Sequence, residues 1–226
     1  THCDTPMFFD QHIRFHERDP KIKVDLHKMT EGRQDATIMV AYLEQKERTD
    51  EALLATTAKA DRLLNEIEEM VAMNCTAVDI AYSPNDLYRL KREGKKAIML
   101  GIENGYAIGK DLSRVAHFRK RGVVYMTLCH NGNNDICGSA RYNEENLGVT
   151  PFGEQVIQEM NRLGMMVDLS HSGERTFYET LDISSQPVVC SHSSSRALCD
   201  HPRNLTDDQL RAIARKGGVV QVCLYS

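Results

Sequence analysis

The chain has 226 residues, of which 41% are hydrophobic and 27% are charged, and its formal net charge is −4. This composition is typical of one globular domain with a sizeable core, and it favours neither a nucleic-acid partner nor a transmembrane segment. The seven cysteines include no Cys-x-x-Cys pair, which excludes a zinc knuckle or a thioredoxin-type motif.

Seven short segments rich in β-branched and apolar residues recur along the chain, and most are separated by segments with helical periodicity. Nearly continuous apolar strands that alternate with helices indicate a parallel sheet buried on both faces. The expected strands cover residues 1–5, 36–43, 96–103, 123–130, 165–171, 187–192 and 218–226. The expected helices cover residues 49–73, 111–122, 151–164, 174–184 and 206–218.

This alternation predicts an α/β fold of the (β/α)₈ TIM-barrel type. A nucleotide-binding doubly wound sheet is disfavoured, because neither a Gly-x-Gly-x-x-Gly sequence nor a Walker motif is present. Seven strands are one fewer than a closed barrel needs. We therefore expect residues 1–226 to form a single barrel domain, truncated at both ends and lacking the eighth strand and the C-terminal helices.

Polar side chains that can bind metals occur where the predicted strands end, and these positions converge on one mouth of a barrel. Strand alternation turns His2 and Asp4 to one face and Cys3 to the other. The same alternation turns Asp168 away from His171 and makes it a weak ligand candidate. The full set of strand-end residues is His2, Asp4, Glu103, His130, His171 and His192.

Each of these residues alone has an ordinary explanation, such as a hydrogen-bonded imidazole or a solvated carboxylate. Their coincidence at one end of the sheet favours a metal site instead. Three histidines and two carboxylates suit zinc or a similar divalent ion. Two ions that share a bridging carboxylate would also explain the need for acidic ligands.

Several motifs together resemble the membrane (renal) dipeptidase family of dizinc peptidases, which includes many bacterial members. They are "THCDTP", "GIENG", "YMTLCHNGNND", "VDLSHSG", "VVCSHSSSRAL" and "HPRNLTDDQLRAIARKGGVV", and they occur in matching order from the first residue to the last. The resemblance implies a (β/α)₈ barrel with two Zn²⁺ ions as cofactors. It assigns His2 and Asp4 to one zinc, His171 and His192 to the other, and Glu103 to the bridge.

The same resemblance implies that His130 contacts the substrate and that Arg203 binds the substrate carboxylate. The expected reaction is hydrolysis of dipeptides, including some with a D-residue at the C-terminal side, by a hydroxide shared between the zinc ions. Glu103 and His130 are the expected catalytic residues, with His130 donating a hydrogen bond to the oxyanion. The sequence departs from the family where it stops, because the family's Asp after the eighth strand is missing.

Two other functions remain open at this point. A metal-dependent amidohydrolase could act on a cyclic amide, lactone or ester, but such proteins usually open with His-x-His and often bridge their metals with a lysine. A non-catalytic barrel is disfavoured by five intact ligand positions.

Homodimers are common in the family, although the sequence does not establish one, and a cytoplasmic or an exported bacterial protein would both fit. The polar loop after His130 is expected to rim the mouth.

Overall fold

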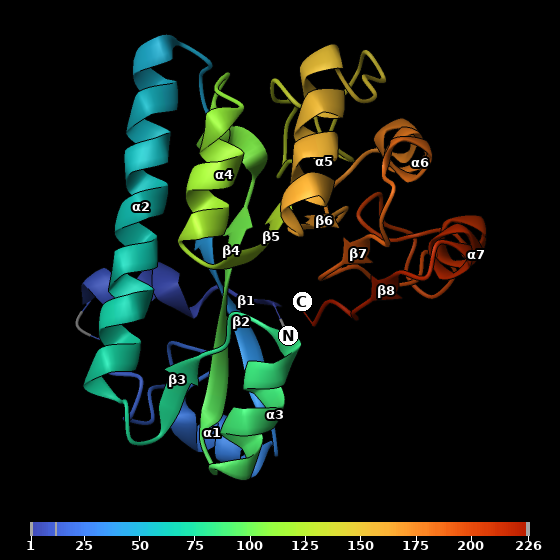
Figure 1. Cartoon of the computed structure of the whole chain (residues 1–226). Helices are drawn as coiled ribbons and strands as arrows, with labels where there is room; N and C mark the ends of the chain where they lie inside the picture. Colours follow the sequence, from blue (N-terminus) through green and yellow to red (C-terminus); the bar gives the residue numbers. More distant parts are fainter. Residues whose placement is uncertain (1, 12, 225–226) are drawn as a thin grey trace.

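A curled parallel sheet runs through the computed structural model, which describes residues 2–11 and 13–224 (Figure 1). Seven strands follow one another in the order β1-β2-β4-β5-β6-β7-β8, and each neighbouring pair is parallel. Residue 1 and residues 225–226, which belong to predicted strands, lie outside the described residues. The strands are β1 (His2–Cys3), β2 (Ala36–Tyr42), β3 (Val78–Ile80), β4 (Lys96–Glu103), β5 (Val123–Thr127), β6 (Met166–Asp168), β7 (Val189–Cys190) and β8 (Val219–Val220).

Strand β3 is the one described strand that the sequence did not predict. It pairs with the first residues of β4, ahead of the part of β4 that pairs with β5, and so lies outside the seven-strand path. Three residues with Asp79 in the middle produce no apolar run, which explains why the pattern was missed. The predicted incomplete (β/α) barrel is otherwise confirmed.

The five predicted helices are all present, and their ends differ from the expected ones by at most three residues. Thr49, Thr150 and Thr206 begin three of them, each accepting a hydrogen bond from a backbone N–H of the first turn. The α-helices are α1 (Leu26–Glu31), α2 (Asp50–Met73), α3 (Pro84–Arg92), α4 (Ser113–Lys120), α5 (Pro151–Leu163), α6 (Glu174–Ile183) and α7 (Asp207–Arg215). The 3-10 helices are η1 (Thr5–Gln11) and η2 (Gly105–Ile108).

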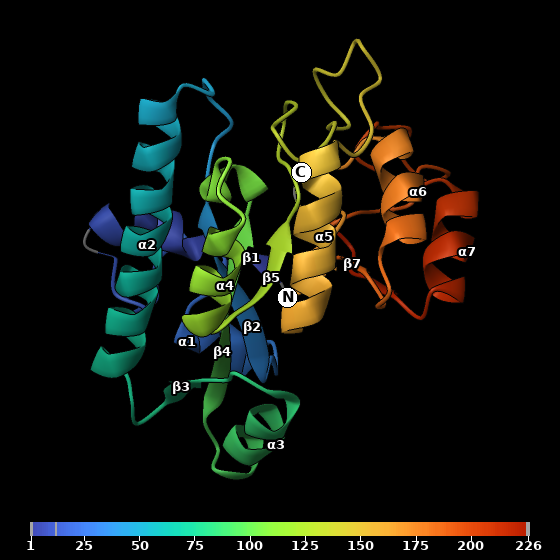
Figure 2. The same ribbon diagram turned by 45° about the horizontal axis from the view of Figure 1, so that its top comes forward.

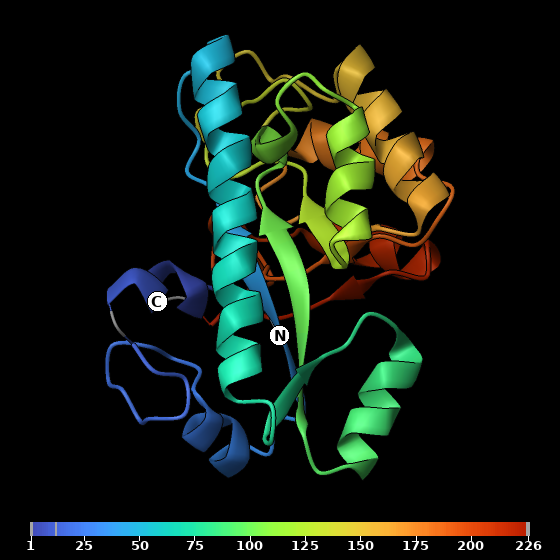
Figure 3. The ribbon, with the colours of Figure 1, turned by 60° about the vertical axis from the view of Figure 1, so that its left-hand side comes forward.

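The two faces of the sheet have different surroundings. Helices α2, α4 and α5 lie side by side over the outer face (Figures 1 and 3). The outward side chains of β4, Ile98, Leu100 and Ile102, are fully buried in the large apolar core there. Inside the curl, a smaller cluster joins β2, β4 and β5, and its members are Ile38, Val40, Met99, Val124 and Tyr125.

The curl brings β1 close to the end of β7. The His2 Nδ1 atom lies 3.4 Å from Ser191 Oγ, and the rings of His2 and His192 are 4.0 Å apart. Figure 2 shows the C-terminal helices α5, α6 and α7 following one another around this side of the sheet. The polar ends of distant strands therefore share one small space inside the curl.

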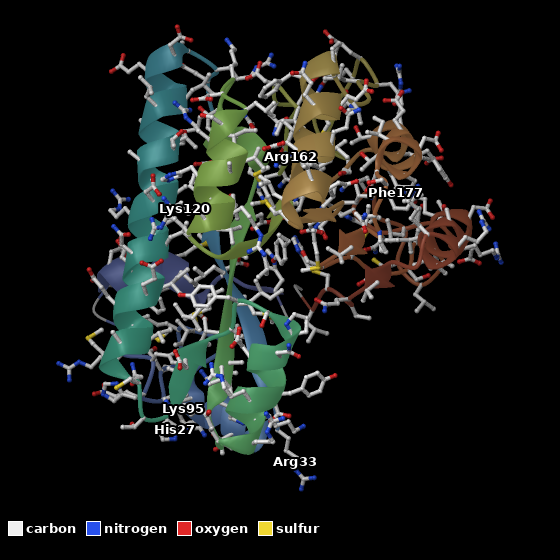
Figure 4. All side chains as sticks on the ribbon, viewed as in Figure 1. His27, Arg33, Lys95, Lys120, Arg162 and Phe177 are labelled. Carbon is white, nitrogen blue, oxygen red and sulfur yellow. The ribbon has the colours of Figure 1, made fainter. Side chains whose placement is uncertain are left out.

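Side chains separate into buried apolar and exposed charged groups on the helices. Figure 4 shows Lys120 at α4 and Arg162 at α5, both exposed, and Arg33 extending outward at the opposite end. Phe177 of α6 is fully buried and faces the rest of the molecule (Figure 4). Within residues 2–11 and 13–224, none of the helices has both the length and the apolar character needed to cross a membrane.

Candidate metal centre and active site

Glu103 lies at the centre of the candidate site. It is the last residue of β4, its side chain alternates inward with Met99 and Gly101, and it is only 3% exposed. Its Oε2 atom lies 3.4 Å from His2 Nε2, whereas Oε1 lies 3.0 Å from His171 Nε2 and 3.2 Å from His192 Nε2. The two carboxylate oxygens thus face different histidines, as expected of a carboxylate between two ions.

Two groups of donor atoms surround the two oxygens of Glu103. In the first group, His2 Nε2 lies 3.1 Å from Asp4 Oδ1; in the second, the Nε2 atoms of His171 and His192 are 2.9 Å apart. Tetrahedral zinc with bonds of about 2.0–2.1 Å separates its ligand atoms by about 3.4 Å. The observed separations fall close to that value, so these residues fit two zinc ions.

The three histidines of these groups share one orientation, with Nε2 toward Glu103 and Nδ1 away from it. Each Nδ1 has a hydrogen-bond partner: Tyr125 Oη for His2 at 2.6 Å, Asn131 Oδ1 for His171 at 3.1 Å and Ser191 Oγ for His192 at 2.8 Å. A metal-binding histidine usually donates its other N–H to such a partner, which fixes the ring and its tautomer. This arrangement directs all three Nε2 atoms at the space beside Glu103.

The electrostatics of the site favour positive charge between the carboxylates. Burial alone would raise the pKa of Glu103, but hydrogen bonds from His171, His192 and His2 hold it well below its usual range. Burial likewise opposes the charged form of His2, yet Asp4 and Glu103 raise its pKa to about 10. A proton is therefore held on Nε2 at the point where a cation would bind.

The second histidine group has the opposite tendency. Burial lowers the pKa of His171 to about 3; the hydrogen bond with Glu103 opposes this effect, and the nearby Arg203 guanidinium adds to it. His171 is consequently neutral at physiological pH, which is the form that binds metals.

Left-handed backbone conformations occur at one site residue, His171, and directly beside another, Glu103. His171 adopts a left-handed conformation with φ 70°, and Asn104, next to Glu103, has φ 86°. Such conformations are strained for residues other than glycine and persist where surrounding contacts hold them. Ala140 N donates to His171 O at 2.7 Å, and the Asn104 side chain bonds to Leu43 O and Asn134. The loop after His130, which includes Ala140 and Asn134, thus supports both turns.

His130 and Arg203 lie beside the two donor groups. The His130 ring is 4.2 Å from the His171 ring and meets Tyr42 edge-on at 4.9 Å, and burial lowers its pKa. Among the described residues, the His130 ring forms contacts with other rings but no hydrogen bond. Arg203, which is partly buried, donates from Nη2 to His192 O at 3.1 Å.

The structure brings all seven predicted site residues together, but three of the histidines predicted at strand ends lie beyond their strands. β5, β6 and β7 end at Thr127, Asp168 and Cys190, so His130, His171 and His192 follow their strands by two or three residues. Alternation between His2, Cys3 and Asp4 is confirmed, since Cys3 is buried on the other side against Thr5.

The alternation argument does not apply between Asp168 and His171, although Asp168 as a weak ligand candidate stays a prediction. The strand ends at this residue, so the parity rule does not extend to His171, and the fully buried Asp168 carboxylate points under the site. Its oxygens lie within 4.8 Å of nitrogens of both His2 and His192. An acid inside the apolar run "MMVDLSH" was the available signal. The Nδ1 partners Tyr125, Asn131 and Ser191 were also missed.

A curled parallel sheet that places one histidine–carboxylate pair and one histidine pair around a single glutamate is typical of the class of metal-dependent (β/α)-barrel proteins. The sequence profile of the family described as "Membrane dipeptidase (Peptidase family M19)" matches residues 1–226. The chain belongs to this family.

Individual relatives agree with this assignment. Dipeptidase tcpJ of Claviceps purpurea is 31% identical over 204 residues, which cover 88% of this chain and 48% of that protein. The crystal structure of the probable dipeptidase PvdM from Pseudomonas aeruginosa is 30% identical and superposes with a TM-score of 0.84, covering 92% of this chain and 55% of that one. The chain spans about half the length of these relatives.

A further solved structure shares the fold at lower sequence identity. The metallopeptidase of Rhodobacter sphaeroides, liganded with a phosphinate mimic of the dipeptide L-Ala-D-Ala, has a TM-score of 0.86 at 20% identity. The match covers 98% of this chain and 72% of that one.

Proposed function

We propose that the protein is a zinc-dependent dipeptidase that hydrolyses the peptide bond of dipeptides. The observation that carries this proposal is the position of Glu103, whose two oxygens face two separate groups of donor atoms. Membership of the membrane dipeptidase family supports the same reaction class.

We assign His2 and Asp4 to one zinc ion, His171 and His192 to the other, and Glu103 to both. When bound, two zinc ions would supply an activated water near neutral pH and a Lewis acid for the peptide carbonyl. The protein residues hold the donor atoms at separations close to those of a tetrahedral site. Neutral His171 and the ionised Glu103 carboxylate match the protonation states that metal binding requires.

His130 and Arg203 are assigned to the substrate. The His130 ring has no hydrogen-bond partner among the described residues, so its N–H is free to donate to an oxyanion formed at the carbonyl. The Arg203 guanidinium, anchored through Nη2 on His192 O, retains further N–H donors for a terminal carboxylate. A free dipeptide presents such a carboxylate close to its only peptide bond.

The activity is tested with a panel of dipeptides that carry either an L- or a D-residue at the C-terminal position, together with N-acetylated controls. The D-series is included because the Rhodobacter sphaeroides metallopeptidase was solved with a mimic of L-Ala-D-Ala. We expect hydrolysis of free dipeptides, loss of that activity with a chelator, and recovery on addition of Zn²⁺. Equal activity with and without the chelator would contradict the proposal.

Substitution Arg203→Ala tests the carboxylate assignment. We expect KM for free dipeptides to rise about 10- to 100-fold, because a charge-assisted hydrogen bond contributes about 1.5–3 kcal/mol. C-terminally amidated dipeptides should be affected little. Arg211→Ala, which alters an exposed arginine of α7, is the matched control. Equal losses on free and amidated substrates would remove Arg203 from carboxylate recognition.

A further inference from the structure

A buried polar network beneath the site connects residues assigned to different metals. Asp168 is fully buried at the end of β6, and its Oδ2 atom accepts hydrogen bonds from Ser191 Oγ at 2.6 Å and from Thr127 Oγ1 at 2.6 Å. Its Oδ1 atom accepts from the backbone N–H groups of Ser191 and Ser170. We propose that Asp168 is a positioning residue that, through Ser191, orients both His192 and His2 and so couples the two metal sites.

The direction of each hydrogen bond follows from counting protons. A serine hydroxyl has one proton, and the 2.6 Å contact with a carboxylate commits the Ser191 proton to Asp168. Ser191 Oγ can then only accept, and His192 Nδ1 at 2.8 Å must be its donor. His192 is thereby held as the Nδ1–H tautomer, with its Nε2 lone pair toward Glu103.

The same reasoning extends to His2 through Tyr125. The Tyr125 hydroxyl lies 2.6 Å from His2 Nδ1, and Ser191 Oγ lies 3.4 Å from the same nitrogen. Because the Ser191 Oγ proton is committed to Asp168, Ser191 cannot donate to His2, so His2 Nδ1–H is the donor and Tyr125 Oη accepts from it. One carboxylate consequently sets the tautomer of a histidine in each donor group, and both Nε2 atoms face Glu103.

A direct metal ligand is the alternative role for Asp168, since its oxygens lie within 4.8 Å of nitrogens of His2 and His192. The Ser191 hydroxyl occupies that space. It lies 2.6 Å from the Asp168 carboxylate, 2.8 Å from His192 Nδ1 and 3.4 Å from His2 Nδ1. Four hydrogen bonds already satisfy the Asp168 oxygens, which favours the positioning role.

This inference rests on the proposed metal site, and its test includes a readout that needs no metal. The variants are Asp168→Asn, Ser191→Ala and Tyr125→Phe. The matched control is Thr127→Val, which removes a 2.6 Å hydrogen bond to the same Asp168 oxygen without touching a histidine. Zinc affinity is measured by competition with a chelator, and histidine tautomers are measured by ¹⁵N NMR on the metal-free protein.

Loss of an outer-shell partner typically weakens metal binding about 10- to 100-fold. We expect that loss for Asp168→Asn and Ser191→Ala, a loss confined to one of the two zinc ions for Tyr125→Phe, and near wild-type affinity for Thr127→Val. In the metal-free wild type, His192 should be the Nδ1–H tautomer, whereas Ser191→Ala should show a mixture of tautomers. Should Asp168→Asn fail to fold, the result for Ser191→Ala decides whether the network positions the histidines.

Two failures are distinguishable. A wild-type protein that binds no zinc overturns the proposed function, while the His192 tautomer still decides the hydrogen-bond network. Unchanged zinc affinity and unchanged tautomer in Ser191→Ala overturn the positioning role, even if the wild type binds two zinc ions and hydrolyses dipeptides.

Discussion

Neighbouring residues of β4 belong to two different environments on the two faces of the sheet. Ile98, Leu100 and Ile102 point outward into the large core beneath the helices. Met99, Gly101 and Glu103 alternate with them and point into the curl. These three outward side chains are all apolar, whereas the inward side chains change from apolar Met99 to charged Glu103 within five residues.

Because of this difference, neighbouring residues of β4 contribute either to the free energy of folding or to the chemistry of the site. Burial of apolar surface on the outer face contributes to the free energy of folding and needs only suitable volume and hydrophobicity. The inner face must hold donor atoms at defined separations, so it depends on specific side chains and their hydrogen bonds. Substitutions at consecutive positions of one strand should therefore affect different properties.

The largest effect is expected for Glu103→Gln. An amide in place of the carboxylate removes charge and donor capacity from both donor groups at once. We expect turnover and zinc affinity to fall by more than about 100-fold, beyond the usual loss for an outer-shell partner. The far-UV circular dichroism spectrum should be unchanged, because the outer core is intact. Near-normal kinetics would remove Glu103 from the bridge.

Leu100→Ala is the matched change on the outer face, three residues before Glu103. Its side chain is fully buried, and truncation of a buried leucine costs about 2–5 kcal/mol. Urea unfolding of the metal-free protein should show this loss in the free energy of unfolding, while zinc affinity of the folded variant should be retained. A parallel loss of zinc affinity would break the proposed separation of the two faces.

Gly101→Ala should have the smallest effect of the three and would sharpen the comparison. A Cβ atom at this position would lie 2.8 Å from Val40 Cγ1, 3.0 Å from Ile38 Cγ2 and 3.1 Å from Tyr125 Cζ. Overpacking of this kind typically costs about 1–3 kcal/mol. We expect that loss in urea unfolding. A more stable variant would show that the inner cluster has free space at Gly101.

The outer face was the more predictable part of the molecule. Apolar runs and helical periodicity located seven strands and five helices, because burial against helices imposes a pattern on every residue of an element. The family motifs and the predicted strand ends together also identified all seven candidate site residues. Those positions are visible in sequence since parallel strands present their C-terminal ends at one edge.

The partners of these residues were harder to predict. Ser191 and Tyr125 act through single hydrogen bonds to His192 and His2, and a serine or tyrosine in an apolar run has no sequence pattern that marks such a bond. Strand alternation was carried past the end of β6, so it could not show that Asp168 lies beneath the site, although Asp168 as a weak ligand candidate stays a prediction. The left-handed backbone at His171 reverses the direction that a continued strand would have predicted.

Metal analysis of the purified active protein tests the central claim most directly, namely that His2, Asp4, Glu103, His171 and His192 form one centre for two metals. The wild type should contain two zinc ions per chain, and Glu103→Gln should lose both under the same dialysis conditions. An active wild-type protein without metal, or a Glu103→Gln variant that retains two zinc ions, would contradict the account.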